Sequence, residues 1–393
     1  MSKKVYITDA KRSAITNFGG SLKHLSPVDI GSNCLTSILE HSPELKTQTD
    51  LVIIGNVLSA GHGQNIARQI ALKSGIDQDI PSFSVNHVCG SSMQAILIGM
   101  NYILSGNADI IIAGGTESMS SAAFAMPNYR WGNKMGHNLL IDTMIQDGLW
   151  DAFNDIHMGV TAENIANQWN ISREEQDIFA LISQQKASKA QKKGVFKDEI
   201  VPITIQTKKE SNIIKDDEFI RHDIKIDKLK KLKPAFEKDG TVTAGNASGL
   251  NDGASFVVLM SEEKARTLKQ PNNIRLIQST TIGNDPKIMG VAPCKAIQKL
   301  LDISKHTIND IDLFEINEAF AAQCIAIQKT LNIPDEKLNV NGGAIALGHP
   351  IGASGARITT TLIHEMKRQK TQTGIASLCI GGGQAISLML KQE

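Results

Sequence analysis

Short apolar runs of strand length alternate with longer helical patterns in two stretches of the chain, residues 1–118 and 251–393. Strands that alternate with helices are typical of α/β layers, because a helix is the usual crossover between parallel strands. Residues 119–250 differ, since loop-like segments precede helical patterns at 158–170 and 172–193. The pattern predicts two α/β halves and an inserted helical and loop domain.

The two α/β halves repeat one order of features. Each contains a strand that ends at an asparagine, a Val-Asn pair, a helix that begins after a glycine-containing loop, and a strand that ends in adjacent glycines. The strands lie at 51–54 and 109–113 in the first half and at 313–316 and 376–380 in the second. This recurrence predicts a duplicated βαβαβ unit, whose equivalent loops meet at the carboxyl ends of the strands, where α/β sheets bind ligands.

Composition and charge narrow the possible partners. The 393 residues are 41% hydrophobic and carry a formal net charge of +1, so no strongly basic field attracts nucleic acid or an anionic membrane. Five widely spaced cysteines without a C-x-x-C pair indicate neither a disulfide framework nor a zinc site. No apolar run has the length of a signal peptide or a membrane span. We expect a cytoplasmic protein with no metal, nucleic-acid or membrane partner.

One local stretch departs from this neutral balance. Residues 186–238 contain 15 Lys and Arg against 9 Asp and Glu. Two interpretations of this stretch are open: a lysine-rich face exposed to solvent, or a binding site for a polyphosphate ligand.

Two residues stand out as a nucleophile and its base. Cys89 follows a strand and opens an apolar helix, where a helix N-terminus lowers a thiol pKa and favours the thiolate, although a cysteine there is also a common core residue. His349 lies among glycines and a proline, so we expect it to be displayed and not packed. The repeat places His349 near Cys89, and histidine is the residue that activates a thiol.

Two further residues end strands at the same edge. Cys379 precedes three glycines, whose N–H groups can approach a substrate oxygen as an oxyanion hole, and a second thiol there can carry a proton. Asn317, at the equivalent place in the repeat, offers an amide that can order a water or orient an imidazole.

These segments together resemble the thiolase family along essentially the whole chain. The motifs are Asn86-His87-Val88-Cys89-Gly90-Ser91, Asn317-Glu318-Ala319-Phe320, Gly348-His349-Pro350 and Cys379-Ile380-Gly381-Gly382-Gly383. Within the family the chain looks most like the short-chain acetyl-CoA acetyltransferases, because His157-Met158-Gly159 and Gly245-Asn246-Ala247-Ser248-Gly249 resemble the loops around the pantetheine and small acyl group.

The resemblance implies a thiolase-like layered α/β fold and a role for each motif residue. Cys89 is acylated, His349 takes its proton and then helps to hold the thioester oxygen, and Cys379 moves the proton at the substrate α-carbon. Asn317 holds a water in one oxyanion hole, and the N–H groups of Cys89 and Gly381 form the other.

Contacts to coenzyme A carry over in the same way. Arg221 is expected near the adenine and 3′-phosphate, Ser248 on the pantetheine, Phe320 beside it, and His157 and Met158 near the acyl end. Coenzyme A is then a substrate and product, with acetyl-CoA and acetoacetyl-CoA, and no cofactor is bound permanently.

The expected reaction is the reversible condensation of two acetyl-CoA to acetoacetyl-CoA and CoA, in fatty acid metabolism. A decarboxylating condensing enzyme is disfavoured, because it is expected to have a second histidine at Asn317. A degradative 3-ketoacyl-CoA thiolase of longer chain length stays open, with His157 and Met158 against it. A non-catalytic acyl-CoA or lipid carrier has no need for both Cys89 and Cys379.

The resemblance also implies a homotetramer, or at least a dimer. The segment 119–136 contains Met126, Tyr129, Trp131 and Met135 without a helical or alternating period, so its own secondary structure cannot bury all of them. Methionine and aromatic residues are enriched at interfaces, which favours this segment as a tetramer contact.

Overall fold

The computed structural model of the protein describes residues 3–206, 210–271 and 273–393. The first half forms β1 (Val5–Ser13), β2 (Thr16–Asn17), α1 (Pro27–His41), α2 (Leu45–Gln48), β3 (Leu51–Gly55), α3 (Ile66–Lys73), β4 (Ser82–Val85), α4 (Ser91–Leu104) and β5 (Ile110–Ser118). The inserted part forms β6 (Phe124–Ala125), β7 (Ile141–Asp142), β8 (Trp150–Asp151), β9 (Ile156–His157), α5 (Met158–Gln168), α6 (Arg173–Lys192), β10 (Ile200–Val201), β11 (Ile203–Gln206), β12 (Ser211–Ile214) and α7 (Ile226–Lys230). The last part forms β13 (Asn251–Ser261), α8 (Glu262–Thr267), β14 (Ile274–Gly283), α9 (Ala292–Ser304), β15 (Leu313–Ile316), α10 (Ala321–Leu331), α11 (Ala344–Leu347), α12 (Ser354–Gln369), β16 (Thr373–Ile380) and β17 (Gln384–Gln392).

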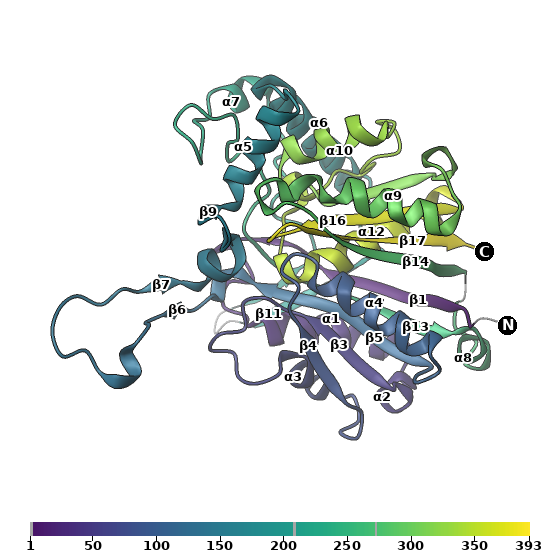
Figure 1. Cartoon of the computed structure of the whole chain (residues 1–393). Coiled ribbons are helices and arrows are strands. Elements are labelled where there is room, and N and C mark those ends of the chain that lie inside the picture. Colours follow the sequence, from purple (N-terminus) through teal and green to yellow (C-terminus); the bar gives the residue numbers. More distant parts are fainter. Residues whose placement is uncertain (1–2, 207–209, 272) are drawn as a thin grey trace.

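The strands of both halves join in one mixed sheet (Figure 1). Its order within the described residues is β15-β16-β17-β14-β1-β13-β5-β3-β4, with β10 beside β1 and β2 beside β13. In the first half β4, β3 and β5 are parallel, and β13 and β1 follow antiparallel. In the second half Leu338 forms a parallel bridge with Phe314 of β15, and β15 is parallel to β16. The next two strands alternate in direction, because β17 is antiparallel to both β16 and β14. The same order and directions occur twice, which confirms the predicted α/β duplication.

The strand β13 belongs by its pairing to the first half, although the sequence division at residue 251 places it with the second. It pairs with β5 over nine consecutive positions and with β1 on its other side. The chain therefore leaves the first half after β5, builds the inserted elements, and returns through β13 to complete the same five strands. The two halves then meet along a short seam, where β1 pairs with β14 at Val5↔Leu276 and Tyr6↔Arg275.

Both faces of the sheet are buried, because successive side chains of a strand point to opposite sides. In β3, Val52 and Ile54 pack in a cluster with apolar residues of α1 and α3, whereas Ile53 packs in a cluster with α4 and α12. The outer face of the second half is covered by α9 and α10. This two-sided burial explains why the strands consist of continuous apolar runs.

The helices α4 and α12, one from each half, pack against each other in the middle layer. Their first turns touch: the Ser92 Oγ accepts a hydrogen bond from the Ala356 N–H at 2.9 Å, and a Cβ at Gly355 would lie 2.6 Å from the Met93 backbone nitrogen. The loops that precede these two helices, which contain Cys89 and His349, are therefore brought to the same place.

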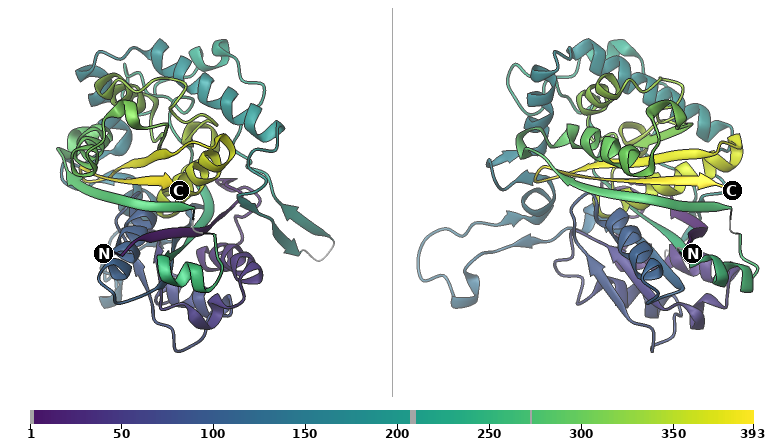
Figure 2. Two further views of the ribbon diagram at one scale, coloured as in Figure 1. Left: turned by 90° about the vertical axis from the view of Figure 1, so that its right-hand side faces the viewer. Right: turned by 45° about the vertical axis from the view of Figure 1, so that its right-hand side comes forward.

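The inserted elements α5, α6 and α7 gather at one end of the molecule, and β6 and β7 form an arm that reaches away from the body (Figures 1 and 2). Ser172 and Glu175 form the expected capping box at the start of α6. No helix formed by residues 3–206, 210–271 and 273–393 is both long enough and apolar enough to cross a membrane.

Candidate active site

Cys89 stands in a tight turn between β4 and α4. The Gly90 N–H donates to the His87 carbonyl at 2.9 Å, and the Ser91 N–H donates to the Val88 carbonyl at 3.1 Å. Val88 has a φ of +46°, a left-handed conformation that is unfavourable for a β-branched residue. Backbone strain of this kind persists only where the surroundings impose it, and it is common at active sites. The turn therefore holds Cys89 in a fixed position.

The electrostatic surroundings of the Cys89 thiol differ from the expectation. Burial of the sulfur raises its pKa to about 11, although hydrogen bonds from the N–H groups of Gly381 and of Cys89 itself act in the opposite direction. The helix α4 begins at Ser91, with Gly90 as its N-cap, and its effect does not outweigh desolvation. A thiolate at Cys89 therefore needs a nearby base. The two N–H groups at the sulfur are the pair that the sequence suggested for an oxyanion hole.

His349 lies in the loop between α11 and a 3₁₀ turn at Ile351–Ala353, and its side chain is buried, with 6% exposed. The prediction that it is displayed is therefore wrong. The glycine loop lies in the interior, between the halves, and the His349 N–H donates to Asn251 Oδ1 at 2.9 Å. Burial, with the positive charge of Arg357, lowers the pKa of the imidazole to about 3. His349 is neutral at physiological pH.

The hydrogen bonds around His349 favour one tautomer. Its Nδ1 lies 2.5 Å from Ser354 Oγ, and that hydroxyl donates its proton to the Pro350 carbonyl at 2.9 Å. A hydroxyl with its one proton committed can only accept from the ring, so Nδ1 carries the hydrogen. The Nε2 lone pair is then free, and this buried atom has no partner among the described residues. His349 can accept a proton at Nε2.

Cys379 lies near the end of β16 and is 1% exposed. Burial raises the pKa of its thiol well above the usual range, and the negative charge of Cys89 adds to this shift. The electrostatic influence of one sulfur on the other indicates that the two thiols lie near each other. The structure thus brings Cys89, Cys379 and Gly381 together, as the sequence predicted.

Asn317 follows β15 and is fully buried. Its N–H donates to the Ser377 carbonyl at 3.0 Å, whereas the side-chain Oδ1 and Nδ2 have no partner among the described residues. Buried amides are normally hydrogen-bonded, because an unsatisfied group costs about 1 to 3 kcal/mol. The amide of Asn317 is therefore free to bind a ligand atom or a water.

An apolar cluster surrounds Cys379. It contains Met158, Met289 and Phe320, with Ala247 and Phe236 against them. A Cβ at Gly381 would lie 3.5 Å from the Met158 sulfur, so Met158 is next to the glycine loop. His157 stacks on Phe236 at 4.7 Å between ring centres. The surroundings of the Cys379 thiol are thus apolar.

Local sequence patterns did not mark Met289, Phe236 or Ser354 as residues of the site. Met289 lies in a kinked 3₁₀ helix at Pro286–Val291 and Phe236 in a loop, and neither segment has a recognisable period. Ser354 carried a signal, because it begins a helix five residues after His349 in a glycine-rich loop.

Two loops expected to hold the pantetheine lie side by side. Ala247 and Phe320 form an antiparallel bridge, and the Ser248 N–H donates to the Ala319 carbonyl at 2.9 Å. Ser248 is half-buried beside this pair. The bridge places Ser248 next to Phe320, at the border of the apolar cluster around Cys379.

Arg221 lies elsewhere, on the exposed segment before α7. Its guanidinium is 5.6 Å from the centre of the Phe219 ring, and the backbone N–H of Arg221 donates to Gln184 Oε1 at 2.7 Å. It lines a cavity of about 400 Å³ together with His222, Asp223, Ile224, Lys228, Leu229 and Leu232. Residues 207–209 of the basic stretch lie outside the described residues.

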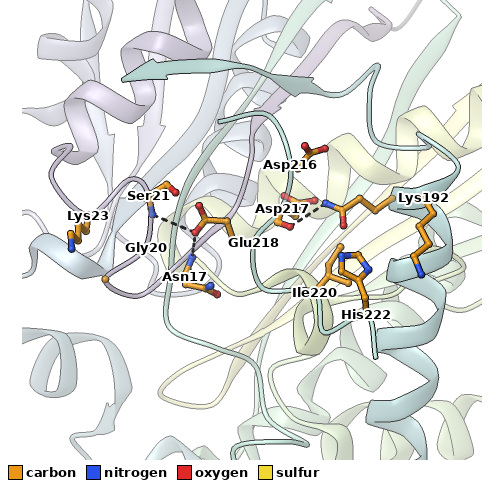
Figure 3. Close-up of a pocket in the computed structure, with 12 residues that line it drawn as sticks. Asn17, Gly20, Ser21, Lys23, Lys192, Asp216, Asp217, Glu218, Ile220 and His222 are labelled. Carbon is orange, nitrogen blue, oxygen red and sulfur yellow. Dashed lines mark hydrogen bonds between the residues drawn. The ribbon is translucent and has the colours of Figure 1, made fainter. Parts of the chain in front are cut away.

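A larger cavity of about 960 Å³ is also lined by His222 (Figure 3). It has carboxylates at Asp216 and Glu218, and Glu218 accepts hydrogen bonds from the N–H groups of Asn17 and Ser21. Neither Cys89 nor the other candidate catalytic residues line it. Among the described residues, no group of His, Cys, Asp and Glu side chains could hold a metal ion.

Comparisons with known proteins agree with this geometry. The family described as Thiolase, N-terminal domain matches residues 5–263, and Thiolase, C-terminal domain matches residues 270–392. A protein of Staphylococcus aureus (strain COL) named probable acetyl-CoA acyltransferase is 50% identical over 390 residues, which are 99% of each chain.

Two solved structures share the fold. The crystal structure of the Bacillus anthracis acetyl-CoA acetyltransferase matches with a TM-score of 0.97 and 44% identity, over 100% of this chain and 99% of that one. Human mitochondrial 3-ketoacyl-CoA thiolase matches with a TM-score of 0.97 and 40% identity, with the same coverage. By its family matches, its relatives and its fold, the chain belongs to the thiolase family.

Proposed function

We propose that this protein transfers an acetyl group between CoA thioesters, condensing two acetyl-CoA reversibly to acetoacetyl-CoA and CoA. The observations that carry the proposal are the buried, neutral His349 with a free Nε2 and the two electrostatically interacting thiols of Cys89 and Cys379, with His349 and Cys89 on the loops that precede the packed helices α12 and α4. One thiol can form an acyl intermediate while the other moves a proton. The name of one bacterial relative, acetyl-CoA acetyltransferase, supports acetyl transfer, and the name of the other, probable acetyl-CoA acyltransferase, supports acyl transfer with acetyl-CoA and leaves the acyl group open.

In the first half-reaction, the Cys89 sulfur attacks the thioester carbonyl carbon as its proton passes to His349 Nε2. The carbonyl oxygen becomes negative and is stabilised by the N–H groups of Cys89 and Gly381. When the carbon–sulfur bond to CoA breaks, Cys379 gives its proton to the leaving sulfur. Acetyl-Cys89, a Cys379 thiolate and a protonated His349 remain.

In the second half-reaction, the Cys379 thiolate takes a proton from the methyl carbon of a second acetyl-CoA. The resulting enolate oxygen is held by protonated His349 and a water on the Asn317 amide. The enolate carbon attacks the acetyl group, the bond to Cys89 breaks, and the released Cys89 thiolate recovers its proton from His349. All three groups return to their starting protonation states.

The chain length of the acyl group is the part of the proposal that most needs a test. The large side chains of Met158, Met289 and Phe320, which pack around Cys379, favour a small acyl group. Cleavage of longer 3-ketoacyl-CoA substrates is the second candidate function, because one structural relative is named 3-ketoacyl-CoA thiolase. Steady-state thiolysis rates with acetoacetyl-CoA and with a 3-ketoacyl-CoA of about ten carbons separate the two. A higher kcat/KM with the longer substrate would reject the acetoacetyl assignment.

We expect CoA to bind with its adenine and 3′-phosphate at the cavity lined by Arg221 and with its pantetheine along Ser248 and Phe320. Arg221→Ala should raise the apparent KM for CoA roughly tenfold and leave kcat nearly unchanged, because a contact remote from the reacting carbon contributes uniform binding. Initial rates across a series of CoA concentrations measure this. Lys189→Ala, a cation of the same basic stretch that lines a different cavity, should leave KM unchanged. An unaltered KM in Arg221→Ala would refute the assignment.

We further propose that the protein is a cytoplasmic homotetramer in which the arm of β6 and β7 is a contact. Apolar side chains along the arm are exposed, with Trp131 85% and Met135 92% accessible. Such an exposed apolar segment is typical of an interaction site.

Trp131→Asp should therefore abolish the tetramer, because a carboxylate buried without a partner costs several kcal/mol. Light scattering on the purified protein measures the assembly. Ile303→Asp, which changes another exposed apolar residue, on α9, is the control and should leave the assembly intact. A monomeric wild type would refute the tetramer, and an unchanged tetramer in Trp131→Asp would refute the contact.

A further inference from the structure

The loop that carries His349 is held by buried side chains from three separate parts of the chain. Glu318 Oε2 accepts the Ile345 N–H at 3.2 Å, Asn251 Oδ1 accepts the His349 N–H at 2.9 Å, and Glu117 Oε2 accepts the Gly352 N–H at 2.8 Å. All three acceptor residues are at most 1% exposed. The loop thus depends on distant acceptors for its shape, and Glu117 holds the side that leads into α12.

Glu117 also holds a second segment, which follows β3. Its Oε1 accepts the Asn56 amide at 2.9 Å and the Leu58 N–H at 3.1 Å, while Oε2 accepts the Val57 N–H at 3.1 Å. Val57 and Leu58 pack with Ile351 in an apolar cluster that Cys89 borders. One carboxylate therefore joins the apolar wall beside Cys89 to the loop of His349.

The approach of the loop to this carboxylate is close. A Cβ at Gly352 would lie 2.5 Å from Glu117 Oε2 and 3.0 Å from the Asn56 Cα. Each carboxylate oxygen accepts two hydrogen bonds, and a glutamine cannot reproduce this, because its NH₂ group would face two donors. The site requires a carboxylate.

This arrangement is costly for the fold. Among the described residues no ion pair with a cation compensates the charge of Glu117, and burial with the like charge of Asp252 raises its pKa to about 7. Burial of a carboxylate without a cation is unfavourable, and the four hydrogen bonds that Glu117 accepts from two separate segments offset this cost. Glu117 and the two segments therefore stabilise one another.

We propose that Glu117 is a positioning residue for the reaction at Cys89, because it fixes the His349 loop relative to the wall beside the thiol. The inference rests on the proposed function, in which His349 Nε2 takes the Cys89 proton. Proton transfer requires a heavy-atom separation within hydrogen-bond reach, and a displacement of about 1 Å can cost 10²-fold in rate. Loss of the carboxylate would displace the loop without removing any group that reacts.

The test measures the first-order rate constant of Cys89 acetylation by rapid quenching and peptide mass mapping at several acetyl-CoA concentrations. Glu117→Gln should lower this rate constant by about 10- to 100-fold, while the acetyl-CoA concentration at half-maximal rate stays within about threefold. Glu117→Asp keeps the charge but is too short to reach both segments, so it should also be slow. If Glu117→Gln does not fold, the acetylation rate of Glu117→Asp tests the proposal.

A matched control separates positioning from stability. Asp312 Oδ2 accepts the N–H groups of Gln372 and Thr373, each at 2.9 Å, at the opposite ends of β15 and β16 from the thiols. Asp312→Asn should lower the melting temperature without slowing acetylation. A rate constant does not depend on how much enzyme is folded, so a purely structural role of Glu117 would leave it unchanged.

The outcomes distinguish the two levels of the proposal. If wild-type Cys89 is acetylated and both Glu117 variants react at the wild-type rate constant, the positioning role is rejected and the proposed function stands. If wild-type Cys89 is not acetylated by acetyl-CoA, the proposed function fails and takes the positioning role with it. A slow Glu117→Gln beside a fast Asp312→Asn supports the inference.

Discussion

Replacement of Cys89 by serine should lower the rate of acetyl transfer by several orders of magnitude. The turn at Val88 would still present the side chain, but a serine hydroxyl is a much weaker nucleophile than a thiol and forms no thioester. Without the acyl intermediate neither half-reaction proceeds. The kcat for thiolysis of acetoacetyl-CoA measures the loss, and mass mapping after incubation with acetyl-CoA should show the label on Cys89 of the wild type.

Cys294→Ser is the control, because Cys294 is also half-buried but lies on α9. Its activity should equal that of the wild type. An acetyl label found on Cys379 and absent from Cys89 would overturn the assignment of the nucleophile.

Replacement of His349 by alanine should have the second largest effect, a loss of about 10²- to 10⁴-fold in kcat, the usual contribution of a positioned general base. The Cys89 thiol is almost entirely protonated at neutral pH, since its pKa is about 11, so the reaction depends on a base that removes this proton. His349 remains neutral as the pH falls, because its pKa is lowered to about 3, and it is competent as a base across the physiological range. The kcat for the condensation and for thiolysis should fall together.

Two further variants test this explanation. His364→Ala removes a largely buried histidine of α12 that hydrogen-bonds to the Ala10 carbonyl, and it should keep the wild-type kcat. Ser354→Ala leaves the imidazole but removes the acceptor at Nδ1, so a loss smaller than that of His349→Ala is expected. A His349→Ala enzyme within threefold of the wild type would exclude the histidine as the base.

Much of the fold follows from local patterns that recur. The strands at β3, β5, β15 and β16 were predicted because apolar runs end in asparagines or glycines twice over, and a repeat constrains each half by the other. The sequence also predicted that the segment 119–136 cannot bury all its large apolar side chains in its own secondary structure, and Trp131 and Met135 are exposed. These features depend on residues close together in the sequence.

The errors concern burial, which depends on distant residues. His349 looked displayed because glycines and a proline surround it, but Asn251 and Glu117 draw its loop into the interior. The Cys89 thiol was expected to have a low pKa, because a helix follows it, but packing against residues from several parts of the chain partly buries the thiol and raises its pKa. The local sequences around His349 and Cys89 do not show which distant segments will cover these residues.

The seam between the halves has a consequence for how activity arises as the protein folds. The first half contributes Cys89 and the second contributes His349 and Cys379, while β1 and β14 pair over Val5↔Leu276 and Tyr6↔Arg275. When only the first half has been synthesised, the Cys89 thiol lacks its proposed base His349, and α4 lacks its packing partner α12. In the proposed mechanism the enzyme is therefore inactive until the second half has folded, and catalytic activity would report the docking of the two halves.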